Sequence, residues 1–374
     1  MEGHTAEVLP EVAAAFQCEG TYHEARPYGA GHINDTYLVS FAAAEPRAYI
    51  FQRINTQVFK DPAALMENIR RVTSHMRRKL EDGGVEAIDR RVLTLVPVAS
   101  GGAYYVDRQG GFWRCYLFIH PSITLQVAFT PDQAHECGRA YGEFQALLGD
   151  LPGGPLHDTI PCFHDLDRRL ESLEEAFAAA PRARVAAVGT EMEFARRWAE
   201  PLQCLTRLYR NGGVPRRITH NDTKINNVLL DPAGRALCVI DLDTVMNGTL
   251  LYDYGDALRT VASSAPEDEP DPGRMRLDLE RFGAFSTGYL EKVGGLLTDA
   301  EWEHLAWAPP AMTFTIAVRF LTDYLAGDVY FKVRYPEHNR VRAQAQCALC
   351  RSMLAGREAM AATVRSVRRG VAPS

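Results

Sequence analysis

The sequence predicts an α+β protein with two lobes, a small β-rich N-lobe and a larger, mainly helical C-lobe. The first observation is length, since 374 residues suffice for two packed lobes with a substantial core. The second is that β-type segments cluster before residue 120, whereas helical periodicity and helix caps dominate after residue 130. We therefore expect the N-lobe to cover residues 1–120 and the C-lobe to cover residues 121–374.

The N-terminal segment predicts a helix and then two strands joined by a glycine-containing turn. Residues 4–17 have the pattern of a short amphipathic helix, and residues 28–39 hold two β-type runs around Gly29 and Gly31. Glycines let backbone N–H groups approach phosphate oxygens, because no Cβ stands in the way. An ordinary hairpin turn explains the same glycines, and the polar side chains beyond them, including Asp35, also suit contact with an acceptor substrate.

Residues 48–54 predict the next strand, which ends in two polar residues, Gln52 and Arg53. Neighbouring side chains on a strand face opposite ways, so only one of the two can face a bound nucleotide. We expect this to be Arg53, because it is cationic. A helix follows, with Asp61 as its N-cap and Pro at its first position.

Further strands are predicted at residues 92–98, 103–106 and 112–119, and the sequence His120-Pro121-Ser122 then breaks the pattern. We expect the hinge between the lobes at this break. A capping box at residues 130–133 opens a long helix. Residues 163–209 are expected to be helical and to lead into a strand at residues 216–219.

The most informative segment is a predicted hairpin with polar residues at its open end. Two β-prone runs, residues 228–230 and 237–240, flank a turn that contains Pro and Gly. The loop before the first run carries Asp222 and Asn227, and the second run ends in Asp241. The hairpin geometry would bring these three side chains together.

Oxygen ligands of this kind suit Mg²⁺, to which phosphates and water supply the remaining ligands. The order of residues also matches the phosphoryl-transfer template, in which a loop Asp serves the attacking hydroxyl while an Asn and a later Asp hold metal. In the structural alternative, the Asp and Asn residues are only turn formers. Turn formers would require no fixed spacing between the two segments, whereas the phosphoryl-transfer template does, so the observed spacing favours the template.

The remainder of the chain contributes a predicted brace, a loop and a polar helix. Asp253 opens a helix after a Gly turn and is expected to brace the loop that carries Asp222, with Asp256 as the competing choice. Residues 263–273 are acidic and Pro-rich, which predicts a mobile surface loop. Arg319 and Asp323 lie four residues apart on a predicted helix, and in the structural alternative they form an intrahelical ion pair without a further role.

Composition excludes several classes of function. The formal net charge is −6, and no basic run interleaved with aromatic residues is present, so a nucleic-acid partner is not expected. The first residues lack the basic region of a signal peptide, and no apolar run is long enough for a bilayer, so we expect a cytoplasmic protein without a membrane partner. The eight scattered cysteines offer no zinc-site spacing and favour free thiols in a reducing compartment.

The segment H-x-D-x-x-x-x-N followed by I-D resembles the aminoglycoside phosphotransferase and choline kinase families, which are relatives of protein kinases. The resemblance implies a bilobal protein kinase-like fold, with ATP and Mg²⁺ as cofactors. It implies that Asp222 is the catalytic base and that Asn227 and Asp241 are metal ligands. It further implies that Gly29 and Gly31 cover the nucleotide, and that the backbone near residues 120–122 meets the adenine.

In those families a strand cation pairs with a helix acid, and the resemblance places Glu67 in the position of that acid. Glu67 could equally be an exposed helix residue. Arg53 and Glu67 are accordingly expected to belong to the cofactor-binding set.

A narrower resemblance comes from five segments, GHINDTY, FQRINTQVF, HNDTKINNVL, VIDLDTVM and RFLTDYLAGDVYFKVRYPEHN. Together they are similar to the N-acetylhexosamine 1-kinases, which use ATP to phosphorylate the anomeric hydroxyl of N-acetylglucosamine or N-acetylgalactosamine. This resemblance implies that Asp35, Asp222, Arg319 and Tyr330 bind the sugar. For Arg319 and Tyr330, a helix ion pair and a core aromatic are the structural alternatives.

Two other hypotheses remain open. The chain could be another small-molecule kinase of the same fold, acting on an aminoglycoside, homoserine or choline. It could also be a pseudokinase that serves as a scaffold, although such proteins usually lose a residue equivalent to Asp222, Asn227 or Asp241. The sequence does not fix the oligomeric state, and we favour a monomer.

Overall fold

The computed structural model describes residues 2–29, 33–45, 47–128 and 130–371, with the backbone only for residues 2–7 and 371, and it divides into two compact units. Unit 1 holds residues 1–122 and 151–160, and unit 2 holds residues 123–150 and 161–374. The first boundary therefore falls beside the predicted hinge. The return of residues 151–160 to unit 1 departs from the single boundary that the sequence predicts.

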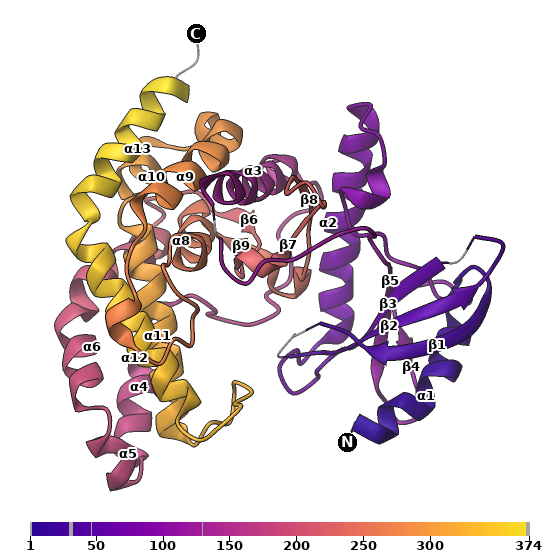
Figure 1. Cartoon of the computed structure of the whole chain (residues 1–374), viewed down its shortest axis with the longest axis horizontal. Helices are drawn as coiled ribbons and strands as arrows, with labels where there is room; N and C mark the ends of the chain where they lie inside the picture. The colour runs from indigo at the N-terminus through magenta and orange to yellow at the C-terminus, as the bar shows by residue number, and fades with distance from the viewer. Residues whose placement is uncertain (1, 30–32, 46, 129, 372–374) are drawn as a thin grey trace. The chain divides into compact units, whose positions relative to one another are not determined.

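Unit 1 is built on an antiparallel sheet of five strands in the order β1-β2-β3-β5-β4 (Figure 1). The strands are β1 (Thr21–Pro27), β2 (Asp35–Ala42), β3 (Arg47–Arg53), β4 (Tyr105–Val106) and β5 (Phe112–Leu117). The predicted strand at residues 92–98 is wrong. Within that segment, Leu95 and Val98 make only isolated bridges, to Tyr116 and Phe16 respectively.

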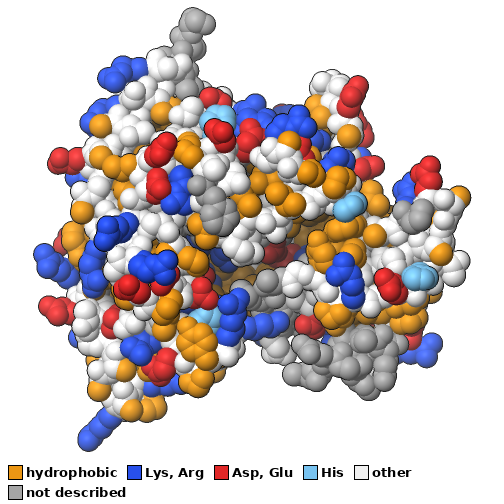
Figure 2. All heavy atoms as spheres, viewed as in Figure 1, with side chains coloured by type: hydrophobic (Ala, Val, Ile, Leu, Met, Phe, Trp, Pro, Cys, Tyr) orange, Lys and Arg blue, Asp and Glu red, His pale blue; other side chains and the backbone are white. Residues whose placement is uncertain are grey.

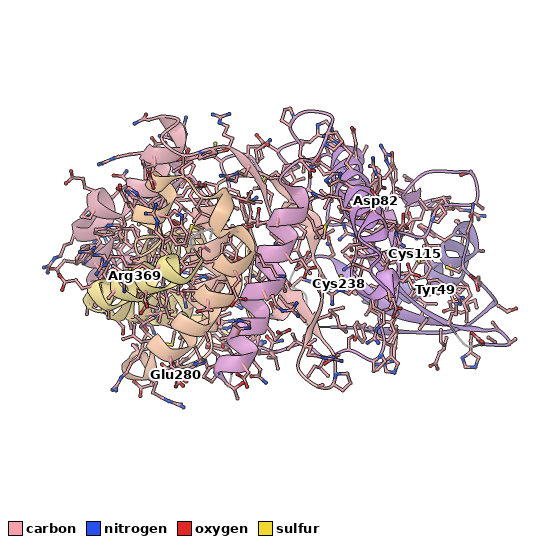
Figure 3. All side chains as sticks on the ribbon, turned by 90° about the horizontal axis from the view of Figure 1, so that it is seen from above. Tyr49, Asp82, Cys115, Cys238, Glu280 and Arg369 are labelled. Atoms are coloured by element: carbon pink, nitrogen blue, oxygen red, sulfur yellow. The ribbon has the colours of Figure 1, made fainter. Side chains whose placement is uncertain are left out.

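Alternation along the strands separates two faces of this sheet. One face joins helix α1 (Glu2–Ala15) in an apolar cluster that contains Phe51, Tyr49 and Cys115 of the strands and Val12 of the helix. Figure 3 labels Tyr49 and Cys115 within this cluster. Helix α2 (Pro62–Asp82) lies on the other side of the sheet from α1 (Figure 1).

Residues 151–160 belong to unit 1 because α2 binds them through their backbone. The Asn68 side chain, which is fully buried, donates to the His157 carbonyl at 2.8 Å and accepts from the His157 N–H at 3.0 Å. Arg71 donates to the carbonyls of Pro152, Gly154 and Pro155. These partners are more than 80 residues apart in sequence, so local patterns could not reveal them.

Unit 2 is mostly helical. Its helices are α3 (Pro131–Leu148), α4 (Leu166–Ala179), α5 (Arg182–Ala186), α6 (Gly189–Leu202), α7 (Cys204–Arg210), α8 (Leu250–Val261), α9 (Leu279–Val293), α10 (Asp299–His304), α11 (Ala308–Ala326), α12 (His338–Ala355) and α13 (Arg357–Val371). The predicted capping box at Thr130 and Gln133 is confirmed at the start of α3. Helix α3 packs along α9, and α11 packs along α12 (Figure 1).

Glycines set the close packing of α3 against α9. A Cβ at Gly138 would lie 2.2 Å from the Phe285 carbonyl oxygen, and one at Gly288 would lie 2.3 Å from the His135 carbonyl oxygen. No side chain fits at either distance, so the two helices approach through their backbones.

Two small antiparallel pairs of strands lie within the helical unit. Strand β6 (Arg217–Thr219) pairs with β9 (Met246–Gly248), and β7 (Val228–Leu230) pairs with β8 (Ala236–Val239). The second pair is the hairpin that the sequence predicts. The fold class is therefore the predicted α+β arrangement of a β-rich unit and a larger helical unit.

Charged side chains of both signs are present on the surface (Figure 2). Acidic and basic side chains are interspersed on the face that Figure 2 shows. Within the described part of the chain, no helix is both long enough and apolar enough to span a membrane.

Candidate active site

The candidate catalytic loop, residues 220–227, connects β6 to β7 and turns sharply at Asn221. Asn221 has φ +64°, a left-handed conformation that Asn tolerates better than most residues. Its side chain donates to the carbonyls of Thr219 at 3.1 Å and Thr244 at 3.0 Å. A Cβ at Gly248 would lie 2.9 Å from the Asn221 side-chain oxygen, so a glycine is required beside this turn.

Two carboxylates of α8 hold the backbone of this loop. Asp253 accepts from the N–H groups of His220 at 2.8 Å and Asn221 at 2.7 Å. Asp256 accepts from the N–H of Thr223 at 2.9 Å. The sequence offered these two residues as alternatives for one brace, and the structure shows that each binds a different part of the loop.

Asp253 is buried and also accepts a hydrogen bond from Gln145. Burial raises the pKa of Asp253 to about 7, although its hydrogen bonds from the His220 and Asn221 N–H groups act in the opposite direction. This carboxyl group is therefore a structural brace whose charge is incomplete near neutral pH.

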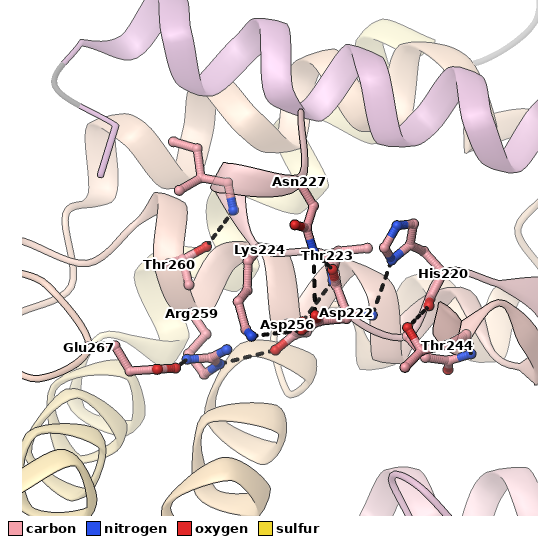
Figure 4. Close-up of polar contacts among 12 residues, drawn as sticks. His220, Asp222, Thr223, Lys224, Asn227, Thr244, Asp256, Arg259, Thr260 and Glu267 are labelled. Carbon is pink, nitrogen blue, oxygen red and sulfur yellow. Dashed lines mark hydrogen bonds and ion pairs between the residues drawn. The ribbon is translucent and has the colours of Figure 1, made fainter. Parts of the chain in front are cut away.

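Asp222 is the acidic side chain that the loop presents beside a cation. Its Oδ1 lies 3.1 Å from Lys224 Nζ, and its carbonyl accepts from Asn227 Nδ2 at 2.9 Å (Figure 4). Burial acts to raise the pKa of Asp222, but the neighbouring Lys224 and His220 outweigh it, and the pKa lies below its ordinary value. Asp222 is consequently an ionised acceptor over the physiological range of pH.

A chain of charged residues continues behind Asp222. Arg259 is 1% exposed, and its Nε donates to Asp256 Oδ1 at 3.0 Å while its Nη1 binds Glu267 (Figure 4). Lys224, Asp256 and Glu267 interact electrostatically within the same chain. Alternating charges of this kind keep a buried site polar without leaving one charge uncompensated.

Glu267 belongs to the acidic segment 263–273, for which the prediction of a mobile surface loop is wrong. Asp268 pairs with His338 at 3.2 Å, and Glu269 pairs with Arg274 at 3.2 Å and is 7% exposed. The prediction rested on the acidic, Pro-rich composition of the segment, which does not reveal partners such as His338 that lie far away in sequence.

The hairpin brings the two candidate metal ligands to the same end. The Ile240 N–H donates to the Asn227 carbonyl at 2.9 Å, so Asn227 lies opposite the residue that precedes Asp241. The Asn227 amide nitrogen faces Asp222, which leaves the amide oxygen on the other side (Figure 4). Asp241 has φ +61° at the turn that follows β8.

This donor set fits a hard cation that takes few protein ligands. Across the described residues, no three or more His, Cys, Asp or Glu side chains form a metal-binding group. One amide oxygen and one carboxylate are compatible with Mg²⁺ in the presence of phosphates, because Mg²⁺ commonly binds one or two carboxylates plus phosphate and water.

A second group of side chains surrounds Arg319 on α11. The guanidinium carbon lies 4.6 Å from the centre of the Phe163 ring, 5.6 Å from Tyr330 and 5.4 Å from Phe331. Arg319 Nη2 also lies 3.5 Å from the Tyr330 hydroxyl. Arg319 and Tyr330 thus lie close together, and Tyr330 is 43% exposed, so it is not a core aromatic; their role in binding a sugar stays a prediction.

Asp323 organises the loop that carries Tyr330. It accepts from the N–H groups of Val329 at 2.9 Å, Tyr330 at 2.8 Å and Phe331 at 2.9 Å. Asn339 also donates to it at 2.8 Å. The carboxylate of Asp323 therefore fixes the loop backbone, and the intrahelical pair with Arg319 that the spacing allowed is not what orders this residue.

In unit 1, Arg53 and Glu67 each lie beside another ionisable side chain, and their expected role toward the nucleotide stays a prediction. Glu67 Oε2 lies 3.0 Å from His157 Nε2, in an exposed pair. Arg53 shares the sheet face of Tyr49 and Phe51, and its charge acts on the nearby Asp107. On the opposite face, Gln52 accepts from Arg114 Nε at 2.9 Å.

Asp35 and Gly29, the remaining predicted residues that the structure describes, belong to unit 1. Asp35 begins β2, and Gly29 precedes it with φ +78° in the turn after β1. Gly31 lies outside the described residues. The roles of these residues stay predictions.

Several residues around the site were not singled out from the sequence. Lys224 stands two positions after Asp222, so its place in the motif was a usable signal. His164, Gln145 and Arg259 carried none, because they reach the loop from other elements: His164 Nε2 lies 2.7 Å from the Asn221 carbonyl oxygen.

Comparison with solved structures shows the same fold in three kinases. A microcompartment-associated aminopropanol kinase has a TM-score of 0.60 and 15% identity, with 95% of this chain and 98% of that chain covered. Spectinomycin phosphotransferase, in complex with ADP and spectinomycin, has a TM-score of 0.58 and 13% identity, with coverages of 93% and 98%. Amicoumacin kinase, solved with AMP-PNP and Ca²⁺, has a TM-score of 0.56 and 12% identity, with coverages of 99% and 96%.

Sequence comparison gives the family directly. The profile described as the phosphotransferase enzyme family (APH) matches residues 24–289, which span unit 1 from β1 onward and the whole candidate catalytic loop. The chain belongs to this family of phosphotransferases, with its kinase-like fold.

Proposed function

We propose that this phosphotransferase transfers the γ-phosphoryl group of ATP to the anomeric hydroxyl of an N-acetylhexosamine, giving the sugar 1-phosphate. The resemblance of five segments to the N-acetylhexosamine 1-kinases motivates this choice. The structural observation that carries it is the arrangement around Arg319 of α11, where the ring of Phe163, from the segment before α4, and the exposed ring of Tyr330 lie beside a hydrogen-bonding cation.

The charges near Arg319 favour a neutral acceptor. Arg169 lies close enough that burial and the charge of Arg319 together lower its pKa to about 10. Two neighbouring guanidinium groups would repel a cationic acceptor such as an aminoglycoside, choline or an amino alcohol. A sugar instead offers apolar C–H faces to Phe163 and Tyr330 and hydroxyl groups to Arg319.

The proposed chemistry assigns one task to each residue. Asp222 accepts a hydrogen bond from the anomeric hydroxyl, aligns its oxygen and takes its proton as the new O–P bond forms and the bond from Pγ to the bridging oxygen of ADP breaks. Lys224 keeps Asp222 ionised. Mg²⁺, for which the Asn227 amide oxygen and Asp241 are the proposed ligands, would supply neutralisation of phosphate charge.

An acceptor panel tests the proposal. The protein would be incubated with ATP and Mg²⁺ and, in separate reactions, with N-acetylglucosamine, N-acetylgalactosamine, glucosamine, galactose, kanamycin, homoserine or choline. Nuclear magnetic resonance of ³¹P and ¹H would then locate the phosphate. We expect phosphate on C1 of an N-acetylhexosamine, whereas turnover on kanamycin or choline alone would overturn the acceptor assignment and leave the phosphotransferase intact.

A further inference from the structure

The peptide bond that precedes Asp222 is held at both of its polar atoms by histidines. The carbonyl of Asn221 lies 2.7 Å from His164 Nε2, and the N–H of Asp222 donates to His220 Nδ1 at 3.2 Å. The other nitrogen of His220, Nε2, donates to the Ile240 carbonyl at 2.9 Å. The orientation of this peptide plane sets the direction in which the Asp222 side chain leaves the backbone.

The hydrogen bonds fix which nitrogen of each ring carries the proton. His164 Nε2 faces a carbonyl and must donate, so the neutral ring carries its proton there. His164 Nδ1 is buried and has no hydrogen-bond partner among the described residues. A proton on Nδ1 would be a buried donor without an acceptor, which argues against both the other tautomer and the charged ring.

His164 is also tied to the Arg319 group through its neighbour in sequence. The Phe163 ring packs on the Arg319 guanidinium at 4.6 Å and on the His164 ring at 4.5 Å. Arg169 holds this segment by donating to the carbonyls of Phe163 at 2.9 Å and Cys162 at 3.3 Å. Phe163 thus contacts Arg319, the proposed acceptor-binding cation, and the next residue, His164, contacts the peptide that precedes Asp222, the proposed base.

We propose that His164 is a positioning residue, whose Nε2–H orients Asp222 toward the acceptor and links that orientation to the Phe163–Arg319 contact. The inference rests on the proposed function, because it takes Asp222 as the group that receives the acceptor proton. Burial, together with the charge of Arg319, lowers the pKa of His164 to about 3, so the ring stays a neutral donor at physiological pH. His164 touches neither nucleotide nor acceptor in this role.

Two substitutions separate the hydrogen bond from the packing of the ring. In His164→Gln the side-chain amide can replace Nε2–H as donor, whereas His164→Leu has similar bulk and no donor. We expect His164→Leu to lower kcat by about ten- to a hundredfold, the order expected for a small misplacement of a catalytic group, with the KM for ATP unchanged. His164→Gln should recover most of kcat, and His135→Gln on α3, which replaces a half-exposed histidine paired with Glu291, should not change it.

The outcomes distinguish this inference from the proposed function. If His164→Leu retains the wild-type kcat while Asp222→Asn does not, or if the Gln and Leu variants are equally impaired, the positioning role is wrong and the function stands. If Asp222→Asn itself keeps the wild-type kcat, the role of Asp222 as the proton acceptor and this inference both fail, whereas the acceptor assignment is tested separately by the acceptor panel. An acceptor other than an N-acetylhexosamine would change only the substrate used in these assays.

A measurement on the wild-type protein requires no variant to fold. With ¹⁵N-labelled histidine, the His164 ring should show a protonated Nε2 and an unprotonated Nδ1 from pH 8 to pH 5. Observation of an unprotonated Nε2 in that range would overturn the inference, because Nε2 could then not donate to the Asn221 carbonyl.

Discussion

At the scale of single residues, Asp222 owes its charge to a balance of opposing effects. Burial disfavours the carboxylate, and Lys224 at 3.1 Å restores it. Its pKa lies below the ordinary value, so the acid limb of a pH–rate profile above pH 5 should not arise from Asp222.

Replacement of Asp222 by Asn should lower kcat by at least about a hundredfold, because general-base assistance of this kind contributes about 10²–10⁴-fold. The KM for ATP should change little, since the amide keeps the shape of the side chain. Steady-state kinetics with saturating acceptor would measure this, and thermal unfolding would show that the fold is intact. A folded variant with near-normal kcat would contradict the assignment.

Asp253, which braces the loop, should behave differently from Asp222, the proposed base. Asp253→Ala would leave two buried N–H groups, of His220 and Asn221, without an acceptor, at about 1–3 kcal/mol for each. We expect it to lose about 2–5 kcal/mol of unfolding free energy in urea titrations. Asp253→Asn should lose less, because burial raises the pKa of Asp253 to about 7 and the amide resembles the protonated carboxyl. Equal losses for Ala and Asn would show that the hydrogen bonds to the loop contribute little.

At the scale of elements, strand β3 of unit 1 shows that neighbouring residues on a strand face opposite sides of the sheet and therefore have different surroundings. Arg53 and Gln52 are adjacent, yet Arg53 shares its face with the apolar cluster under α1, and Gln52 shares its face with Arg114 of β5. The sequence identified the strand and its alternation but could not show which face the helix α1 would cover.

This register gives a prediction about the nucleotide. We predict that the nucleotide meets the sheet face of Gln52 and Arg114 rather than the face of Arg53 that the sequence favoured. Arg114→Gln should then raise the KM for ATP about tenfold or more, the loss expected when a charged hydrogen bond is replaced by a neutral one, while Arg53→Gln should change it less than about twofold. The KM for the acceptor would serve as the internal control in both variants. The reverse order of effects would return the phosphate-facing role to Arg53.

Elements also differ in how far the sequence could anticipate them. The β7–β8 hairpin and the α3 capping box depend on residues close together in the chain, and both were predicted. Other contacts join residues that are further apart in sequence. Residues 263–273 are anchored by Arg259, which is 8 residues from Glu267, and by His338, which is 70 residues from Asp268. His164 approaches Asn221 across 57 residues. Such contacts form only when the helices have packed, so no local pattern contains them.

At the scale of the whole molecule, stability and pH are coupled through buried groups of opposite sign. Burial lowers the pKa of His164 to about 3 in the folded protein, whereas the ordinary pKa of histidine in an unfolded chain is about 6.5. Above pH 6.5 the ring is neutral in both states, so His164 does not lower the stability of the fold there. As pH falls below that value, the unfolded chain binds a proton that the folded protein does not, and stability is lost. Asp253 has its pKa raised from 3.8 to about 7, so between these pH values the folded protein binds a proton that the unfolded chain does not, and its contribution to stability increases as pH falls.

Comparison of the wild type with His164→Gln isolates the histidine, because Asp253 is common to both proteins. Below pH 6.5, the unfolding free energy of the wild type should fall relative to that of His164→Gln by about 1.4 kcal/mol per pH unit. Between pH 7 and pH 5, the wild type should therefore lose about 2 kcal/mol relative to the variant. Urea titrations at several pH values would measure it. A difference that stays constant over this range would mean that His164 takes up a proton in the folded protein.

The manner in which Asp323 holds its loop has an evolutionary consequence. It binds the backbone N–H groups of residues 329–331, which every amino acid except proline possesses. The path of the loop is therefore independent of the side chains that it displays, and Val329 is 78% exposed. Lineages, or a directed-evolution library, can exchange those side chains without rebuilding the loop, provided that Asp323 is kept.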